Sequence, residues 1–211
     1  APFAPRRQTI GAVNILVDGK LHWDVRRGIA KALALLPGTD EQKQTAAGQI
    51  EEFFRQRIRA ILLDQGVDYD IIDAVLSGPV DDVYALFLRA QSMKAAAVKD
   101  EADLRQAVTR LANITKGKEA VSVLPALFEV PEENGLWTAY VQTGLKVKTA
   151  YDTYDYAAAL PALRELTAPI NAYLDKVMVM VDDEAVKANR ISTLLKVLDL
   201  FKPWGDFSKL V

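Results

Sequence analysis

Apolar residues recur every three or four positions through most of this chain, and this spacing limits its possible folds more than any other feature. The three clearest series lie within residues 50–62, 104–114 and 191–201. A repeat of about 3.6 residues places such side chains on one face of an α-helix. A glycine follows each of the first two series and Pro203 follows the third, as expected where helices end.

Other segments show the same spacing less clearly. These weaker helical patterns occupy residues 7–16, 23–36, 69–76, 83–98, 135–150 and 156–173. Pro161 and Pro169 predict that the last of them is kinked or broken. Only "AVNILVDG" at residues 12–19 and "VMVMV" at residues 177–181 are strand-like. Two short strands do not make a stable sheet, so we predict an all-α protein with two helical regions.

The "VMVMV" string connects two predicted helices near the end of the chain. In an extended conformation its three valines point to one side and its two methionines to the other. We expect a buried crossover that fixes the angle of the final helix, with the methionines filling gaps between helix ends. The tail residues Trp204, Phe207 and Leu210 should fold onto the same core.

A domain boundary is predicted near residues 95–101, because the run "KAAAVKDEAD" at residues 94–103 lacks large apolar side chains. We therefore divide the chain into a helical region, residues 1–98, and a helical bundle, residues 99–211. The first residue is Ala1 rather than methionine, which fits a processed chain or a fragment.

Composition excludes several classes of protein. The 26 Lys and Arg residues are balanced by 28 Asp and Glu residues, so any contact with nucleic acid must be local rather than a general grip on phosphates. No cysteine is present, which rules out disulfides and thiolate zinc sites and fits the cytoplasm. No apolar run reaches the roughly 20 residues of a membrane span.

Catalytic and metal-binding motifs are also lacking. His22 is the single histidine, whereas a histidine metal site needs several ligands. The pair Gly117-Lys118 fails as a phosphate loop because Ala112 and Glu119 stand where that motif needs Gly and Ser or Thr. The acidic pairs at residues 81–82 and 182–183 are interpreted as helix caps. We predict no catalytic residue and no metal ligand.

Two helices carry polar side chains of the types that bind RNA. On the first, Asn113 lies opposite the apolar stripe and Arg110 lies on its flank, at about 100° per residue. On the second, Asn189 and Lys196 share the polar face and Arg190 borders it. Both faces fit an ordinary solvated surface. Asn and Arg are also the residues that read base edges and stack on bases, so both interpretations stay open at this point.

A family resemblance emerges from longer stretches. Residues 170–210, "INAYLDKVMVMVDDEAVKANRISTLLKVLDLFKPWGDFSKL", resemble the C-terminus of the bacterial glycyl-tRNA synthetase β subunit. "APFAPRRQTIGAVNIL" is similar to the family's Asp-Pro-Phe-Ala-Leu-Arg-Arg stretch, "FFRQRIRAILLDQGVDYDIIDAVL" to its next landmark, and "AVTRLANITK" to its Lys-Arg-x-x-Asn-Ile helix. The departures are Ala1, Pro5, Thr109 and "KPWG".

The resemblance implies a DALR-type anticodon-binding bundle from about residue 100, preceded by another helical part of the β subunit. Its partners would be tRNA(Gly), the α subunit and the rest of the β subunit. The whole enzyme joins glycine to its tRNA with ATP and magnesium, and the resemblance places that site on the α subunit. It therefore implies no cofactor in this chain.

The resemblance also assigns roles to particular side chains. Base-reading residues would be Arg110, Asn113, Asn189 and Arg190, and phosphate contacts would be Lys116, Lys187 and Lys196. Thr109 stands where the family's helix carries a lysine, so one positive charge is missing there. Asn189 could brace the crossover instead of reading a base. Two alternatives remain: a helical protein-interaction scaffold that binds no RNA, and the corresponding domain of an arginyl-tRNA synthetase, which should lack the Val-Met-Val-Met string.

Overall fold

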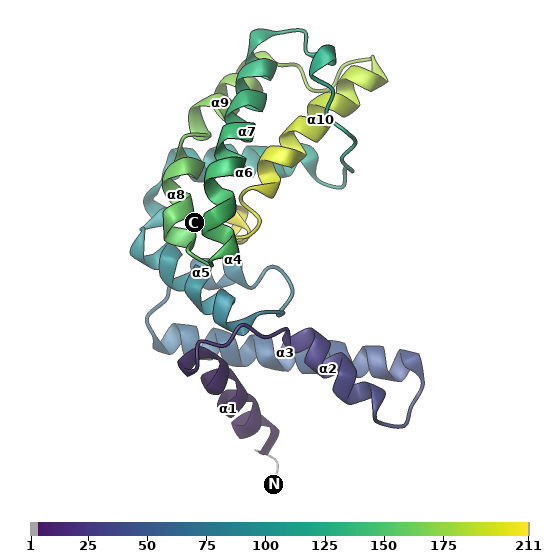
Figure 1. The fold of residues 1–211 in the computed structure, drawn as a ribbon, viewed down its shortest axis with the longest axis vertical. Helices are drawn as coiled ribbons and strands as arrows, with labels where there is room; N and C mark the ends of the chain where they lie inside the picture. Colours follow the sequence, from purple (N-terminus) through teal and green to yellow (C-terminus); the bar gives the residue numbers. More distant parts are fainter. Residues whose placement is uncertain (1–3, 211) are drawn as a thin grey trace. The chain divides into compact units, whose positions relative to one another are not determined.

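The computed structural model describes residues 4–210, and in this part of the chain it contains ten α-helices, three 3-10 helices and no strand (Figure 1). One isolated antiparallel bridge joins Asp24 and Asp82. The predicted all-α class is confirmed. Across the described residues, no helix has the length and apolarity that a membrane crossing needs. Ala1, one of the departures from the family pattern, lies outside the described residues.

Two compact units make up the chain, Ala1–Ala95 and Ala96–Val211. This division falls close to the boundary that we placed between residues 98 and 99.

The first unit consists of five helices that pack mainly on α3. They are α1 (Ala4–Asp18), α2 (Val25–Ala34), α3 (Asp40–Asp64), α4 (Tyr69–Val75) and α5 (Val83–Ala95). α1 packs against α3 and α5, α2 against α3, and α4 against α5. α3 begins with a capping box, in which the Thr39 hydroxyl accepts from the Gln42 N–H and the Gln42 side chain accepts from the Thr39 N–H. α3 ends before Gly66, whose φ of 70° favours glycine.

The strand-like reading of "AVNILVDG" was wrong, because residues 12–18 belong to α1. Val13 and Leu16 are buried while Ile15 is 66% exposed. Residues three apart therefore share the buried side, which is the spacing of a helix and not of a strand. A short apolar run does not distinguish the two by itself.

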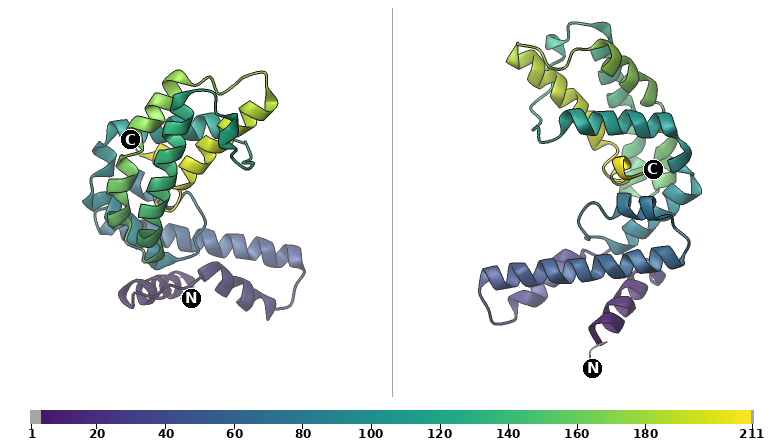
Figure 2. Two further views of the ribbon diagram at one scale, coloured as in Figure 1. Left: turned by 45° about the horizontal axis from the view of Figure 1, so that its top comes forward. Right: turned by 180° about the vertical axis from the view of Figure 1, so that it is seen from behind.

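The second unit is a helical bundle (Figures 1 and 2). Its elements are η1 (Val98–Asp100), α6 (Ala102–Thr115), η2 (Pro125–Leu127), α7 (Pro131–Asp152), α8 (Tyr156–Arg164), α9 (Thr167–Lys176), α10 (Glu184–Asp199) and η3 (Phe207–Lys209). α6 packs against α9, α10 and η3, and α7 packs against α8, α9 and α10. The break predicted from Pro161 and Pro169 is confirmed, since α8 and α9 are separate helices.

The crossover between α9 and α10 starts with Val177 in an extended conformation, bends at residues 179–180 and pairs with no strand. Val177 and Val179 are 6% and 9% exposed, whereas Met178 and Met180 are 73% and 53% exposed. The predicted alternation is therefore confirmed, but the prediction that the methionines fill gaps in the core is wrong. Trp204, Phe207 and Leu210 are all buried, as predicted for the tail.

Candidate nucleic-acid interface

Arg110 lies on α6 and reaches across to α9. Its Nη1 donates to Asn171 Oδ1 at 3.2 Å and its Nη2 donates to Asp175 Oδ1 at 2.8 Å. The Arg110 side chain is 37% exposed and that of Asp175 is 63% exposed. An ion pair with this much solvent access contributes little to folding, and the guanidinium still presents part of its surface to solvent.

Asn113 and Lys116 are both exposed, at the carboxyl end of α6. Thr115, between them in the sequence, is buried, so the packed side of this helix end is the side away from Asn113. Gly117 follows with φ of 70°, which turns the chain away from α6. Arg110, Asn113 and Lys116 thus occupy the last turns of one helix, as the sequence predicted.

Asn189 is placed very differently, because it is only 2% exposed. Its Oδ1 accepts from the backbone N–H of Leu124 at 2.7 Å, and its Nδ2 donates to the Leu124 carbonyl at 3.1 Å. The side-chain amide of Asn189 thus satisfies both the N–H and the carbonyl of Leu124. Nearby, the Ser192 hydroxyl accepts from the Val121 N–H at 2.9 Å. These two residues of α10 fix segment 116–130, which connects α6 to α7 and contains η2.

Arg190 is also buried, at 4% exposure. Its Nε donates to Glu133 Oε1 at 2.9 Å and its Nη2 to Glu129 Oε2 at 2.7 Å. Its Nη1 donates to the Met178 carbonyl at 3.0 Å. The planar guanidinium therefore joins α10 to the start of α7, to segment 116–130 and to the crossover.

The prediction that Asn189 and Arg190 lie on an exposed polar face is wrong. The physical reason is that segment 116–130 and the crossover both cover the first half of α10, so that polar positions are buried against backbone groups. Arg110 turns toward α9 and Asn189 toward Leu124, and the structure does not bring them onto one shared surface. Whether either buried residue affects RNA binding stays a prediction.

The two lysines predicted on α10 are half-buried. Lys187 Nζ donates to Glu184 Oε1 at 2.5 Å in the first turns of the helix, while Lys196 lies in the last turn. Lys187 is therefore already partly neutralised by its own helix.

Sequence reasoning missed Glu133, the partner of Arg190, which is fully buried at 0% exposure. Burial raises the pKa of its carboxyl group, but hydrogen bonds from Arg190 and from the N–H groups of Glu129 and Val130 outweigh that effect and lower the pKa below its usual value. The bond with Glu133 in turn raises the pKa of Arg190. One sequence signal was available: Glu133 stands two residues after Pro131, at the N3 position of α7, where a capping carboxylate is common.

The lowered pKa of Glu133 predicts a pH dependence of stability. A depressed folded-state pKa stabilises the fold above the unfolded-state pKa of about 4.3, and this stabilisation is lost as the pH falls through the folded-state value. We expect Glu133→Gln to unfold more easily at pH 7 and to lose less stability than the parent between pH 5 and pH 3, in urea titrations. Glu165→Gln is the matched control, because the Glu165 side chain is 60% exposed in its pair with Lys146; an equal change in both variants would contradict the assignment.

The described residues contain no group of three or more His, Asp or Glu side chains placed to hold a metal ion. The side chains that the structure leaves presented to solvent at the candidate site are those at the end of α6. The polar residues of α10 stabilise the segments beside it.

Comparisons with known proteins give one consistent family. Residues 1–77 match the protein-family model described as "Glycyl-tRNA synthetase beta subunit". The curated "Glycine--tRNA ligase beta subunit" of Desulforudis audaxviator is 36% identical over 99% of this chain, and that of Halalkalibacterium halodurans is 34% identical over 100%. The Clostridioides difficile protein of the same name is 32% identical over 100%. The chain spans 30 to 31% of the length of these relatives.

Proposed function

Because this chain is a homologue of part of the glycyl-tRNA synthetase β subunit, we propose that it forms the C-terminal, tRNA-binding region of such a subunit. The observation that carries the proposal is the extent of the likeness: relatives with this name match 99 to 100% of the chain. The complete enzyme would join glycine to tRNA(Gly) with ATP and magnesium bound by the α subunit. This chain would supply binding energy and no reacting group.

Within the chain, we assign anticodon recognition to the second unit, as a DALR-type bundle. Near-neutral net charge means that affinity must come from a few placed side chains rather than from general attraction to phosphates. Arg110, Asn113 and Lys116 supply a guanidinium, an amide and an ammonium group within the last turns of α6. An unpaired anticodon base offers edges that Asn and Arg can pair with and a face on which Arg can stack.

The buried residues take a supporting role in this proposal. Asn189 and Arg190 hold segment 116–130 and the crossover in place, and the proposal keeps Lys187 and Lys196 as phosphate contacts. Holding a binding surface rigid before the ligand arrives reduces the entropy lost on binding. The contribution of Asn189 and Arg190 would therefore be indirect.

Substitutions at the end of α6 test this assignment. We expect Arg110→Ala and Asn113→Ala each to weaken tRNA(Gly) binding by about 1–3 kcal/mol, the range for a base read by paired hydrogen bonds. Thermal unfolding should change little, because Asn113 is exposed and the Arg110–Asp175 pair is solvated. Fluorescence anisotropy of a labelled tRNA(Gly) transcript measures the binding.

Gln106→Ala is the matched control, since Gln106 is an exposed amide on the same helix. Its affinity should equal that of the parent chain. If all three variants bind alike, α6 does not read the anticodon. If Arg110→Ala or Asn113→Ala unfolds at a much lower temperature, the residue is structural.

A further inference from the structure

The helical hairpin of α2 and α3 lacks a core of its own. No residue from 26 to 57 is buried, although this range contains nearly all of α2 and the first 18 residues of α3. Val25 and Ile58, just outside the range, are 1% and 0% exposed. The two helices run side by side in every view (Figures 1 and 2), and α2 packs against α3.

This exposure conflicts with the amphipathic sequence of the hairpin. Ile29 and Leu33 on α2, and Ile50, Phe53 and Phe54 on α3, are all only half-buried. Helices in proteins owe most of their stability to burying such an apolar face. A further element packed against α3 would complete the burial of Ile50, Phe53 and Phe54.

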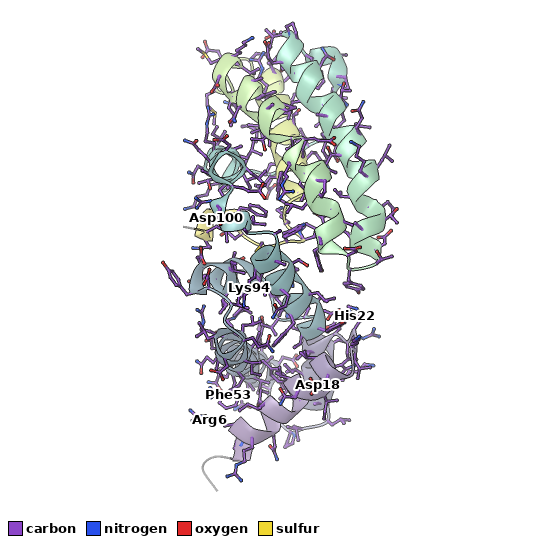
Figure 3. All side chains as sticks on the ribbon, turned by 90° about the vertical axis from the view of Figure 1, so that its left-hand side faces the viewer. Arg6, Asp18, His22, Phe53, Lys94 and Asp100 are labelled. Atoms are coloured by element: carbon purple, nitrogen blue, oxygen red, sulfur yellow. The ribbon has the colours of Figure 1, made fainter. Side chains whose placement is uncertain are left out.

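A groove between α1 and α3 marks where such an element fits. Its volume is about 460 Å³, and Ala12 on one side and Ile50 and Phe54 on the other line it. Phe53 also lines the groove, and Figure 3 labels it on α3 beside α1. The guanidinium of Arg57 lies 4.5 Å from the centre of the Phe53 ring, so the adjacent cation is already engaged with an aromatic face.

We propose that this groove receives an amphipathic helix from the part of the β-subunit polypeptide that lies outside the stretch matched by this chain. The inference rests on the proposed function, in that it takes the chain to be one portion of a longer β subunit. About two thirds of the relatives' length lies outside the match. The groove falls within residues 1–77, where the family model also matches.

The chemistry of the groove excludes RNA as its occupant. All eight lining residues are uncharged, and six of them are Pro, Ala, Thr, Ile or Phe. Nucleic acid binding depends on neutralising phosphates with Lys and Arg, which this lining does not offer. An apolar helix face, in contrast, would cover Ile50 and Phe54 and displace water from them.

Covalent linkage favours a segment of the same polypeptide over a separate protein. A tethered segment meets the groove at an effective concentration in the millimolar range. It also avoids most of the translational and rotational entropy that two free molecules lose on association. A helix of the same polypeptide would therefore cover the apolar side chains of the groove more readily than a separate protein would.

Thiol labelling tests the proposal, because the natural chain has no cysteine. Gln49 lines the groove and is exposed, so Gln49→Cys places a single reactive thiol there. The control is Gln142→Cys, an exposed amide on α7. Each variant is prepared twice: as the 211-residue chain, and within a Desulforudis audaxviator β subunit whose matching portion is replaced by this chain and whose own cysteines are changed to serine.

We expect maleimide labelling at position 49 to be at least about tenfold slower in the long protein than in the short chain, and labelling at position 142 to be unchanged. Equal rates at position 49 would overturn the proposal, as would protection that requires added tRNA(Gly) or added α subunit. Protection of the short chain that grows with its own concentration would assign the groove to a second copy instead. Filter binding of tRNA(Gly) to the short chain is scored separately, so failure of the groove and failure of the proposed function are distinguishable.

Discussion

Replacing Arg190 with alanine is expected to lower the free energy of unfolding by about 3–5 kcal/mol, the cost of leaving a buried charge without its partner. The stranded charge is the carboxylate of Glu133, which is 0% exposed and hydrogen-bonded to Arg190 Nε at 2.9 Å. The change also removes the bond from Arg190 to the Met178 carbonyl. Urea unfolding followed by circular dichroism measures the loss.

Two companion variants separate charge from geometry. Arg190→Lys keeps the positive charge but loses the planar fork, so it should fall between the parent chain and Arg190→Ala. The double variant Arg190→Met with Glu133→Leu removes both charges and should recover a large part of the loss. An Arg190→Ala variant as stable as the parent would show that this buried pair does not hold the crossover and α7 together.

Leu194→Ala is expected to cost about 2–5 kcal/mol, as for other fully buried leucines. Leu194 is 0% exposed on α10, and the truncation leaves a cavity that packed neighbours fill only in part. Its neighbour Leu195 is half-buried, so Leu195→Ala should cost about 1 kcal/mol, near the centre of the range for single substitutions.

This pair also tests the orientation of the helix. The two variants make the same substitution at adjacent positions of one helix. The difference between their losses of stability therefore reports the burial of the two side chains. Thermal unfolding of the two variants side by side is the measurement. Equal costs, or a larger cost for Leu195→Ala, would mean that α10 is rotated about its axis relative to the structure.

The sequence predicted helices well where their apolar residues face a single core. The series at residues 50–62 and 104–114 fall inside α3 and α6, and the glycines after them have φ of 70°. Periodicity succeeds there because one side of the helix meets protein and the other meets water. The break near Pro161 and Pro169 was predicted for a similar local reason.

Sequence reasoning failed on α10, where segment 116–130 and the crossover cover the polar side. Asn189, Ser192 and Thr193 are all buried, and nothing in their spacing distinguishes them from a solvated face. Their burial depends on the path of segment 116–130, which has no periodic signal. The same limit explains why Met178 and Met180 were expected inside: the alternation showed that valines and methionines face opposite ways, but not which way faces water.

The candidate site was also predictable only in part, on α6 but not on α10. Arg110, Asn113 and Lys116 lie where α6 periodicity placed them, on or beside its exposed side. Arg190 and Glu133 are 57 positions apart in the chain, and only the tertiary fold reveals that they form a buried pair. The family resemblance gave Asn189 and Arg190 a base-reading role, whereas their hydrogen bonds support a positioning role.

The most direct test of the central claim is filter retention of the purified 211-residue chain with two transcripts, tRNA(Gly) and the same tRNA carrying a different anticodon. Anticodon reading predicts that tRNA(Gly) binds at least about tenfold more tightly, equivalent to about 1.4 kcal/mol. Equal retention of the two transcripts, or retention of neither, would contradict anticodon recognition, and the second result would favour a helical scaffold that binds no RNA.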